Sequence, residues 1–396
     1  MPILSLLLNL IILYNISNDI RRRGVFIYMK FICPKDTILK EVEYASNFTS
    51  QRNSLSISSN ILLENYQNVL TIKGTDGKLG FVTSFPVSTD VPGSTTVTCD
   101  KFLQVLKSMP SVDIEFSEEK DKMKITPVKD SKSINFNIRT ISAEHFPELL
   151  QYDENAFFSL SQRDFFDMVD KTAFAVGTDE SKFFLTGVYL EKKDDQVVMV
   201  ATDSKRLSCI RKSFEQDIPD FRSSIIPVKF LQILRNIGIG EGLFSLMLTD
   251  THIFAQINGH LIYSSLITGN YPAYQRVIPP SFNYECKVNV SEMLEALNRV
   301  SIFVESNSKK IFLELRPDGI MLSGETSDVG DAKEIVSCEY NGPEANITFN
   351  NNFLVSSLKK IDTEYFRICF NSATTAMAFF PDPEKDYIFI IMPMHA

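Results

Sequence analysis

The chain has 396 residues, of which 44% are hydrophobic and 22% are charged, a composition typical of globular proteins. Its net charge of −9 argues against a protein whose whole surface is basic for binding nucleic acid, but not against a locally basic face. The six cysteines show no CxxC pattern and no regular spacing. This distribution predicts reduced, mostly buried thiols in a cytoplasmic protein.

The first 28 residues differ from the rest of the chain. Residues 3–14 form a nearly continuous apolar run, and three arginines, Arg21 to Arg23, follow it. A secretory signal carries its positive charge before the apolar run, and a membrane-spanning helix needs about 20 apolar residues. We therefore interpret residues 1–28 as an extension outside the fold, with Met29 as the functional start. A membrane-tethering role is the alternative.

An apolar pair that opens a short amphipathic stretch recurs along the chain at intervals of 60–65 residues. Each pair is followed by further apolar residues at helical spacing, which predicts one short helix per repeat. The six pairs are Ile38-Leu39, Phe102-Leu103, Phe165-Phe166, Phe230-Leu231, Met293-Leu294 and Phe353-Leu354.

Strand-like segments fill the spaces between the predicted helices. Alternating apolar residues flank the turn dipeptides Asp76-Gly77, Asp194-Asp195, Asn258-Gly259 and Asp318-Gly319, which predicts tight β-hairpins at these points. Each repeat is therefore expected to contain one helix and about four antiparallel strands.

Two repeats per domain give three similar α+β domains, each with two helices packed on antiparallel sheets. Polar or Pro-rich segments between helices place the boundaries at 29–153, 154–279 and 280–396. A row of such units leaves an unpaired strand at each end, and closure into a ring removes these edges. The repeat therefore favours a closed assembly over an open rod.

The sequence shows no catalytic signature. It lacks a Walker-type phosphate loop, HExxH and GxSxG, and its four histidines are far apart. The segment from Gly74 to Lys78 lies within a strand alternation, so it predicts a hairpin rather than a phosphate cradle. We predict no catalytic residue, no cofactor and no metal site. The alternatives are an enzyme with an unrecognised active site on the same scaffold, or a structural or surface-exposed β-rich protein.

Three segments carry a resemblance to a known family. They run from Val200 to Leu207, from Gly269 to Pro279 and from Ile388 to Met394. Together they resemble the bacterial DNA sliding clamps, the beta subunits of DNA polymerase III, whose pattern reads ATDGHRL, FPDYRRVIP and a terminal VMPMRL in this order. The resemblance covers residues 29–396.

The resemblance implies a non-catalytic DNA polymerase processivity factor with the DNA clamp fold. Two three-domain subunits would join head to tail in a homodimeric ring around duplex DNA, without sequence preference. Twelve helices would line the hole, and a continuous sheet would form the outside. The implied partners are the catalytic subunit of DNA polymerase III, the clamp loader, and other DNA polymerases and repair proteins.

The resemblance also implies three sets of site residues. The pocket for a short Gln/Leu/Phe-type partner peptide would comprise Leu185, Thr202, Lys205, Arg206, Leu207, Pro272, Arg276, Val277, Asn350, Phe353, Thr375, Ile390, Met392, Pro393 and Met394. The DNA contacts would be Arg52, Lys101, Lys107, Lys182, Phe183, Phe184 and Lys229. The dimer interface would use Phe136 on one face and Ile302 with Phe303 on the other.

Further basic residues of the predicted helices are candidate DNA contacts, although each could equally be a solvated helix charge. They are Lys35, Lys40, Arg163, Lys171, Arg235, Arg299, Lys359 and Lys360. The chain departs from the family pattern at Ser204-Lys205, at Phe353 and at His395-Ala396, which alters the polar contacts expected at the pocket rim.

Overall fold

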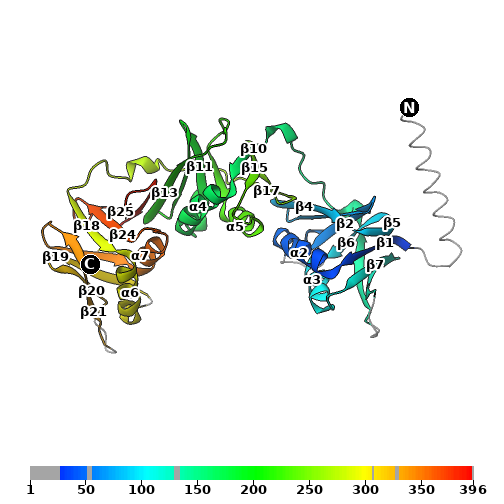
Figure 1. Cartoon of the computed structure of the whole chain (residues 1–396), viewed down its shortest axis with the longest axis horizontal. Coiled ribbons are helices and arrows are strands. Elements are labelled where there is room, and N and C mark those ends of the chain that lie inside the picture. The colour runs from blue at the N-terminus through cyan, green and yellow to red at the C-terminus, as the bar shows by residue number, and fades with distance from the viewer. Residues whose placement is uncertain (1–26, 51–55, 129–133, 306, 326–329, 395–396) are drawn as a thin grey trace. The chain divides into compact units, whose positions relative to one another are not determined.

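The computed structural model describes residues 27–50, 56–128, 134–305, 307–325 and 330–394 (Figure 1). The apolar run at residues 3–14, the predicted DNA contact Arg52 and the departure at His395-Ala396 lie outside these residues. The chain divides into two compact units. One comprises the residues up to Phe157 together with Phe254–Ser265, and the other comprises Phe158–Ile253 and the chain from Leu266 onward.

Among its described residues, the first unit contains two helices, α2 (Lys35–Ala45) and α3 (Cys99–Ser108), which pack side by side (Figure 1). Its strands follow the order β16-β17-β4-β3-β2-β6-β9-β8-β7-β1-β5. They are β1 (Ile27–Pro34), β2 (Asn60–Tyr66), β3 (Val69–Thr75), β4 (Leu79–Pro86), β5 (Ser88–Val91), β6 (Gly93–Thr98), β7 (Asp113–Glu119), β8 (Lys122–Pro127), β9 (Phe136–Ser142), β16 (His252–Ile257) and β17 (His260–Ser265).

The described part of the second unit contains four helices, α4 (Gln162–Thr172), α5 (Val228–Ile237), α6 (Val290–Val300) and α7 (Asn351–Leu358). Short 3₁₀ helices accompany them: η6 (Ala173–Ala175), η7 (Glu180–Leu185), η8 (Tyr274–Arg276) and η9 (Ser301–Phe303). Helices α6 and α7 contact each other, as Figure 1 shows.

Most strands of the second unit form one nine-stranded sheet in the order β14-β11-β12-β13-β26-β25-β24-β18-β22. Its members are β11 (Gly187–Lys193), β12 (Gln196–Thr202), β13 (Arg206–Ser213), β14 (Ser224–Pro227), β18 (Tyr284–Asn289), β22 (Cys338–Tyr340), β24 (Tyr365–Phe370), β25 (Met377–Asp382) and β26 (Tyr387–Ile391). A four-stranded sheet follows the order β21-β20-β19-β23, with β19 (Lys310–Arg316), β20 (Gly319–Ser323), β21 (Lys333–Val336) and β23 (Ala345–Asn350). Strands β10 (Phe158–Ser161) and β15 (Leu243–Leu248) pair with each other.

All six predicted helices are confirmed, because each apolar pair lies within one of α2 to α7. The helices bury the face that these pairs open. In α3, for example, Cys99, Phe102 and Leu106 are buried at helical spacing. The short helix α7 begins at an Asn350 cap, whose side-chain oxygen accepts a hydrogen bond from Asn352 N at 3.0 Å.

The predicted hairpins are also confirmed. Asn258 and Gly259 adopt φ of 50° and 80° between β16 and β17, and Asp194 adopts φ of 55° between β11 and β12. Positive φ angles match the right-handed twist of the paired strands. All six cysteines are free thiols, and Cys338 alone among them is not fully buried, which agrees with the prediction. No helix among the described residues is long and apolar enough to cross a membrane.

Candidate functional site

An apolar pocket of about 240 Å³ opens in the second unit. Four elements form it: the end of η7, the turn between β12 and β13, the loop around η8, and the end of β26. Its lining residues are Leu185, Thr202, Ser204, Lys205, Arg206, Leu207, Pro272, Tyr274, Val277, Ile390 and Met392. The pocket therefore joins segments from the middle of the chain to its C-terminus.

The turn from β12 to β13 is held by its own side chains. Asp203 Oδ1 accepts hydrogen bonds from the backbone N of Lys205 and of Arg206, both at 2.9 Å. Thr202 Oγ1 donates to the Arg206 carbonyl at 2.6 Å. Ser204 completes the turn with φ of 75°, in the left-handed region where the family motif has glycine. The turn thus presents Lys205 at the pocket rim in a fixed position.

Arg206 forms one wall of the pocket, and each of its three guanidinium nitrogens donates a hydrogen bond within the protein. Nε donates to Asp203 Oδ2 at 3.0 Å, Nη1 to Ser356 Oγ at 2.7 Å and Nη2 to the Phe174 carbonyl at 2.7 Å. The same group lies over the Phe353 ring, 4.6 Å from its centroid. Arg206 therefore connects β13 to both η6 and α7 rather than offering a free charge.

The C-terminal segment closes the pocket beyond β26. Met392 N donates to the Lys205 carbonyl at 2.9 Å, and Met394 N donates to the Thr348 carbonyl at 2.7 Å. Pro393 between them has no N–H to donate, so strand pairing ends there. Ile390 is buried whereas Met392 is 40% exposed. The flexible, polarizable side chain of Met392 therefore lies at the entrance of the pocket, and Ile390 forms part of its apolar base.

The structure brings most of the predicted pocket residues together. Leu185, Thr202, Lys205, Arg206, Leu207, Pro272, Val277, Ile390 and Met392 line one pocket. The prediction omitted Ser204 and Tyr274, which also line it. The buried Tyr274 lies between the predicted pocket residues Pro272 and Val277 in the sequence, and this position could have identified it as a lining residue.

The remaining predicted pocket residues lie outside this lining. Asn350 caps α7. Phe353 lies beneath the Arg206 guanidinium. Thr375 Oγ1 bonds the Ser372 carbonyl in a turn at 3.2 Å. Arg276 is exposed at the end of η8, while Pro393 and Met394 are half-buried after β26.

The predicted DNA loop borders the same pocket. Phe183 is 49% exposed and meets Phe184 edge to face at 5.8 Å between ring centroids. Lys182 Nζ donates to Oγ of the pocket residue Ser204 at 3.5 Å. The next residue along the chain, Leu185, lines the pocket.

Several basic helix residues named as candidate DNA contacts are paired with carboxylates. Lys107 Nζ lies 3.1 Å from Glu43, Arg235 Nε lies 3.4 Å from Asp170, and Arg299 bonds Glu334 in a bidentate pair. Exposed pairs of this kind can exchange for phosphate.

Lys171 corrects the prediction. Its side chain is buried, with the residue 6% exposed, and its ammonium pairs with Asp167 and Asp362, each at 3.0 Å. Helical periodicity places Lys171 on α4 but does not show that the chain folds over it. A buried and paired cation does not reach a phosphate backbone, so Lys171 is not a DNA contact.

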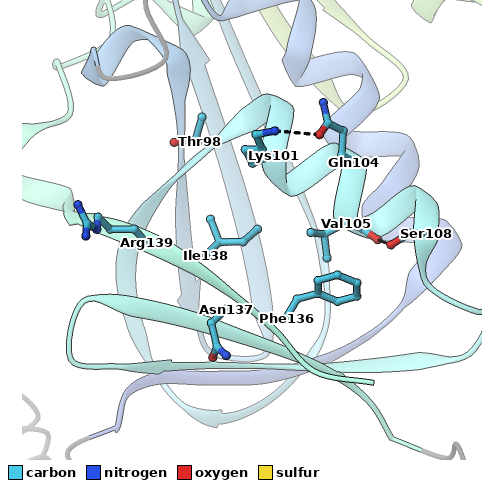
Figure 2. Close-up of a pocket in the computed structure, with 9 residues that line it drawn as sticks. All are labelled: Thr98, Lys101, Gln104, Val105, Ser108, Phe136, Asn137, Ile138 and Arg139. Atoms are coloured by element: carbon cyan, nitrogen blue, oxygen red, sulfur yellow. Dashed lines mark hydrogen bonds between the residues drawn. The ribbon is translucent and has the colours of Figure 1, made fainter. Parts of the chain in front are cut away.

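A second hollow, of about 500 Å³, lies in the first unit between α3 and β9. Figure 2 shows Phe136 on β9 next to Val105 of α3, with Lys101 and Ser108 along the same helix. Residues Phe136–Arg139 pair with β8, while pairing of β9 with β6 begins at Thr140. This stretch of β9 is therefore a strand edge beside an apolar hollow.

The predicted opposite face carries an exposed apolar residue. Ile302 on η9 is 77% exposed, whereas Phe303 is half-buried. Strand β21 is the edge of the four-stranded sheet, and its Ile335 is 52% exposed. Edge strands with exposed apolar side chains are available for pairing with another chain.

Among the described residues, no group of three His, Cys, Asp or Glu side chains could hold a metal ion. Burial raises the pKa of the Cys33 and Cys99 thiols to about 12, which disfavours the thiolate needed for nucleophilic catalysis. The structure instead has an apolar pocket of a size that suits a short peptide, on a scaffold of repeated helices and sheets. These features are typical of a protein that binds partners.

Comparison with known proteins gives the family. Models of the DNA polymerase III beta subunit match in chain order: the N-terminal domain over residues 29–150, the central domain over 159–273 and the C-terminal domain over 275–395. The beta sliding clamp of Treponema pallidum is 34% identical over 370 residues, covering 92% of this chain and 99% of the relative. That of Bacillus subtilis is 27% identical with the same coverage.

Solved structures agree with the sequence matches. A sliding clamp of Pseudomonas aeruginosa, in a crystal structure with griselimycin bound, superposes with a TM-score of 0.86 at 25% identity, covering 93% of this chain and all of that chain. The Bacillus subtilis clamp gives a TM-score of 0.87 at 24% identity, with the same coverage. The chain belongs to the DNA polymerase III beta subunit family, the bacterial sliding clamps. The three-domain α+β clamp fold and the role of a DNA polymerase processivity factor follow, and an enzyme on the same scaffold is not favoured.

Proposed function

We propose that two copies of this chain close head to tail into a ring that encircles duplex DNA and tethers DNA polymerase III to its template. The observation that carries this proposal is the apolar pocket that the β12–β13 turn forms with the end of β26. We place the domains at 29–153, 154–279 and 280–396, with residues 1–28 outside the ring.

A ring tethers by topology, so it does not need tight DNA binding. Duplex threaded through a closed ring cannot leave sideways, and weak phosphate contacts permit sliding. This suits a chain whose net charge is −9, provided that the bore is locally basic. We propose contacts from Arg52, Lys101, Lys107, Lys182, Phe183, Phe184 and Lys229.

The apolar pocket would hold a short peptide of a partner protein through Leu and Phe side chains. Burying about 200 Å² of apolar peptide surface contributes about 5 kcal/mol before the ordering costs are subtracted. The resulting binding is weak and exchangeable, and Met392 suits a pocket that adapts to several partners. Arg276, Asn350, Phe353, Thr375, Pro393 and Met394 would extend the pocket along the peptide.

For the subunit interface, we propose that Ile302 and Phe303 of one copy enter the hollow beside Phe136 of the other. The strand edges β9 and β21 are both available, so their pairing would continue a sheet across the interface. Pairing would also remove two exposed edges. Each ring would contain two such interfaces because the contact is heterologous and closes.

The proposed partners are the DNA polymerase III catalytic subunit, the clamp loader, and other DNA polymerases and repair proteins in the cytoplasm. We propose that the chain catalyses no reaction itself. The test is primer extension on a long single-stranded circle with Met392→Ala and, as a matched exposed control, Ile239→Ala. We expect Met392→Ala to lose stimulation of the polymerase while the mass of the native dimer is unchanged. The control should behave as wild type. Normal stimulation by Met392→Ala would show that the pocket assignment is wrong.

A further inference from the structure

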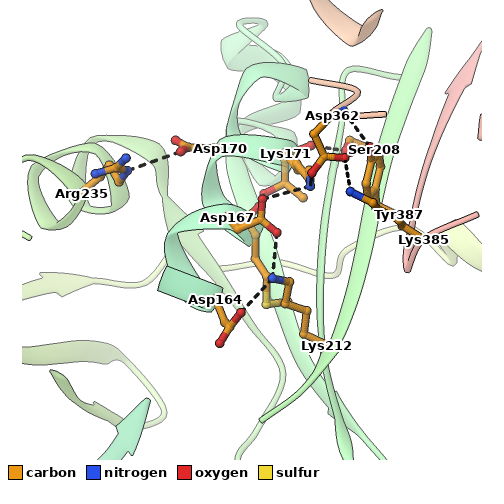
Figure 3. A network of polar contacts seen from close by, with 12 residues as sticks. Asp164, Asp167, Asp170, Lys171, Ser208, Lys212, Arg235, Asp362, Lys385 and Tyr387 are labelled. Carbon is orange, nitrogen blue, oxygen red and sulfur yellow. Dashed lines mark hydrogen bonds and ion pairs between the residues drawn. The ribbon is translucent and has the colours of Figure 1, made fainter. Parts of the chain in front are cut away.

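A chain of alternating charges connects the central segment of the second unit to its C-terminal segment (Figure 3). It runs from Lys212 on β13 through Asp167 and Lys171 on α4 to Asp362 after α7, and it ends at Lys385. The successive nitrogen–oxygen distances are 2.8, 3.0, 3.0 and 2.9 Å.

Lys171 is the buried centre of this chain of charges. Its ammonium lies 4.1 Å from the centroid of the Tyr387 ring, and its carbonyl accepts a hydrogen bond from Ser208 Oγ. The Tyr387 hydroxyl in turn donates to Asp362 Oδ1 at 2.7 Å. Lys171 thus contacts β13, β26 and the segment after α7 at once.

The strand pair β13–β26 joins this charged network to the peptide pocket. Ile210 pairs with Tyr387 at the network end, and Leu207 pairs with Ile390 at the pocket end. Three residue steps of an antiparallel strand span about 10 Å. A displacement of β26 at Tyr387 would therefore move Ile390 and Met392, which form the C-terminal wall of the pocket.

Arg206 supplies the second attachment between the same two segments. It bonds the Phe174 carbonyl in η6, directly after α4, and Ser356 in α7, shortly before Asp362. Residues 162–175 and 351–362 are therefore joined at two points, one beside the pocket and one at the Lys171 site. Two attachments fix an orientation that one attachment leaves free to rotate.

We propose that Lys171 and Asp362 are positioning residues of the peptide pocket. They hold β26 against α4 so that the central and C-terminal walls keep the spacing a partner peptide requires. Neither residue is among those that line the pocket, and the inference rests on the proposed peptide-binding function. The attraction of two carboxylates offsets the cost of burying the Lys171 ammonium. When Asp362 is neutralised, much of that attraction is lost, so the contact between β26 and α4 should open and let water reach Lys171.

The test uses the full-length protein and a fluorescein-labelled short peptide that carries Gln, Leu and Phe. Asp362→Asn should raise the peptide Kd about fivefold. The apparent affinity is lower when a smaller fraction of the molecules has its pocket walls at the spacing that binds the peptide. The double variant Lys171→Met with Asp362→Asn should recover most of the affinity, because no charge is then buried without a partner. Glu314→Gln, which breaks the exposed pair with Arg316 on β19, is the matched control and should bind as wild type.

Hydrogen exchange supplies a readout on the pocket wall itself. The Met392 amide, which bonds the Lys205 carbonyl, should exchange faster in Asp362→Asn than in the Glu314→Gln control. If Asp362→Asn binds the peptide as tightly as wild type while Met392→Ala loses it, the positioning role is wrong and the pocket stands. If the wild-type protein fails to bind the peptide, the proposed function falls and this inference falls with it.

Discussion

His260 Nε2 lies 2.7 Å from Glu41 Oε2 in the first unit, which joins β17 to helix α2. His260 is buried, and both of its ring nitrogens face acceptors: Nδ1 donates to the Ile257 carbonyl at 3.2 Å, and Nε2 donates to Glu41. Thr83 Oγ1 also donates to Glu41 Oε2, at 2.9 Å. A carboxylate with two donors thus joins the β16–β17 hairpin to helix α2.

This contact predicts a pH-dependent stability. Burial alone would raise the pKa of Glu41, but the hydrogen bonds of His260 and Thr83 and the His260 charge outweigh it and hold that pKa below its usual range. The nearby Lys40 charge acts in the same direction. A lowered folded-state pKa contributes stability above the unfolded value of about 4.3, and this is lost as pH falls through the folded value.

The variant that checks this is Glu41→Gln. It should destabilise the first unit by about 1–2 kcal/mol at pH 7, and the difference from wild type should vanish at acidic pH. Urea unfolding followed at several pH values measures both. Glu43→Gln on the same helix breaks an exposed pair with Lys107 and should change stability little at any pH. A loss for Glu41→Gln that persisted unchanged in acid would contradict the account.

Ser204→Gly should stabilise the protein. Ser204 holds φ of 75°, where a side chain costs about 1–2 kcal/mol and glycine costs none. Glycine gives back part of this gain through the entropy of the unfolded chain, so a net gain of about 0.5–1 kcal/mol is expected. Thermal unfolding measures it, and a lower midpoint for Ser204→Gly would refute the strain at this turn.

Gly80→Ala should destabilise the first unit by about 2–3 kcal/mol. Gly80 on β4 pairs with Tyr263 on β17, and a Cβ at position 80 would lie 2.0 Å from Cζ of the Tyr263 ring. The Tyr263 ring therefore requires a residue without a side chain at position 80. In a protein that already carries Tyr263→Ala, adding Gly80→Ala should cost less stability than it costs in the wild-type protein. Additive losses in this double-mutant cycle would show that the ring is not the obstacle.

Ile302→Asp should break the proposed dimer. An exposed isoleucine on η9 is expected to become buried at the interface, where an unpaired carboxylate is costly. Native mass spectrometry should then report a single chain of 44.9 kDa instead of twice that mass. Ile239→Asp, at a similarly exposed isoleucine after α5, serves as the control and should keep the dimer. A dimeric Ile302→Asp protein would place the interface elsewhere.

Local sequence patterns predicted much of the fold. The six helices follow from apolar pairs at 60–65-residue intervals, and the hairpins follow from dipeptides such as Asn258-Gly259. These features depend on neighbouring residues, whose spacing is printed in the sequence. The resemblance to sliding clamps supplied most residues that now line one pocket.

Contacts between segments that are distant in the chain could not be predicted from local sequence patterns. Lys171 meets Asp362 across 191 residues, and helical periodicity alone presented it as a candidate DNA contact. The hairpin Phe254–Ser265 packs with the first unit through β4, a pairing that no local pattern signals. Tyr274 faces the pocket from a short 3₁₀ helix that no periodicity signals. Each of these depends on packing between segments that the linear order keeps apart.

Topological retention distinguishes a chain that closes into a ring around DNA from one that binds DNA along its side. The clamp is loaded onto a nicked circular plasmid by a clamp loader, washed at high salt and then measured before and after the plasmid is linearised. A closed ring should be retained on the circle at high salt and should be lost within the time needed to slide off the new ends. Dissociation from the circle at high salt, or equal retention on linear and circular DNA, would contradict it.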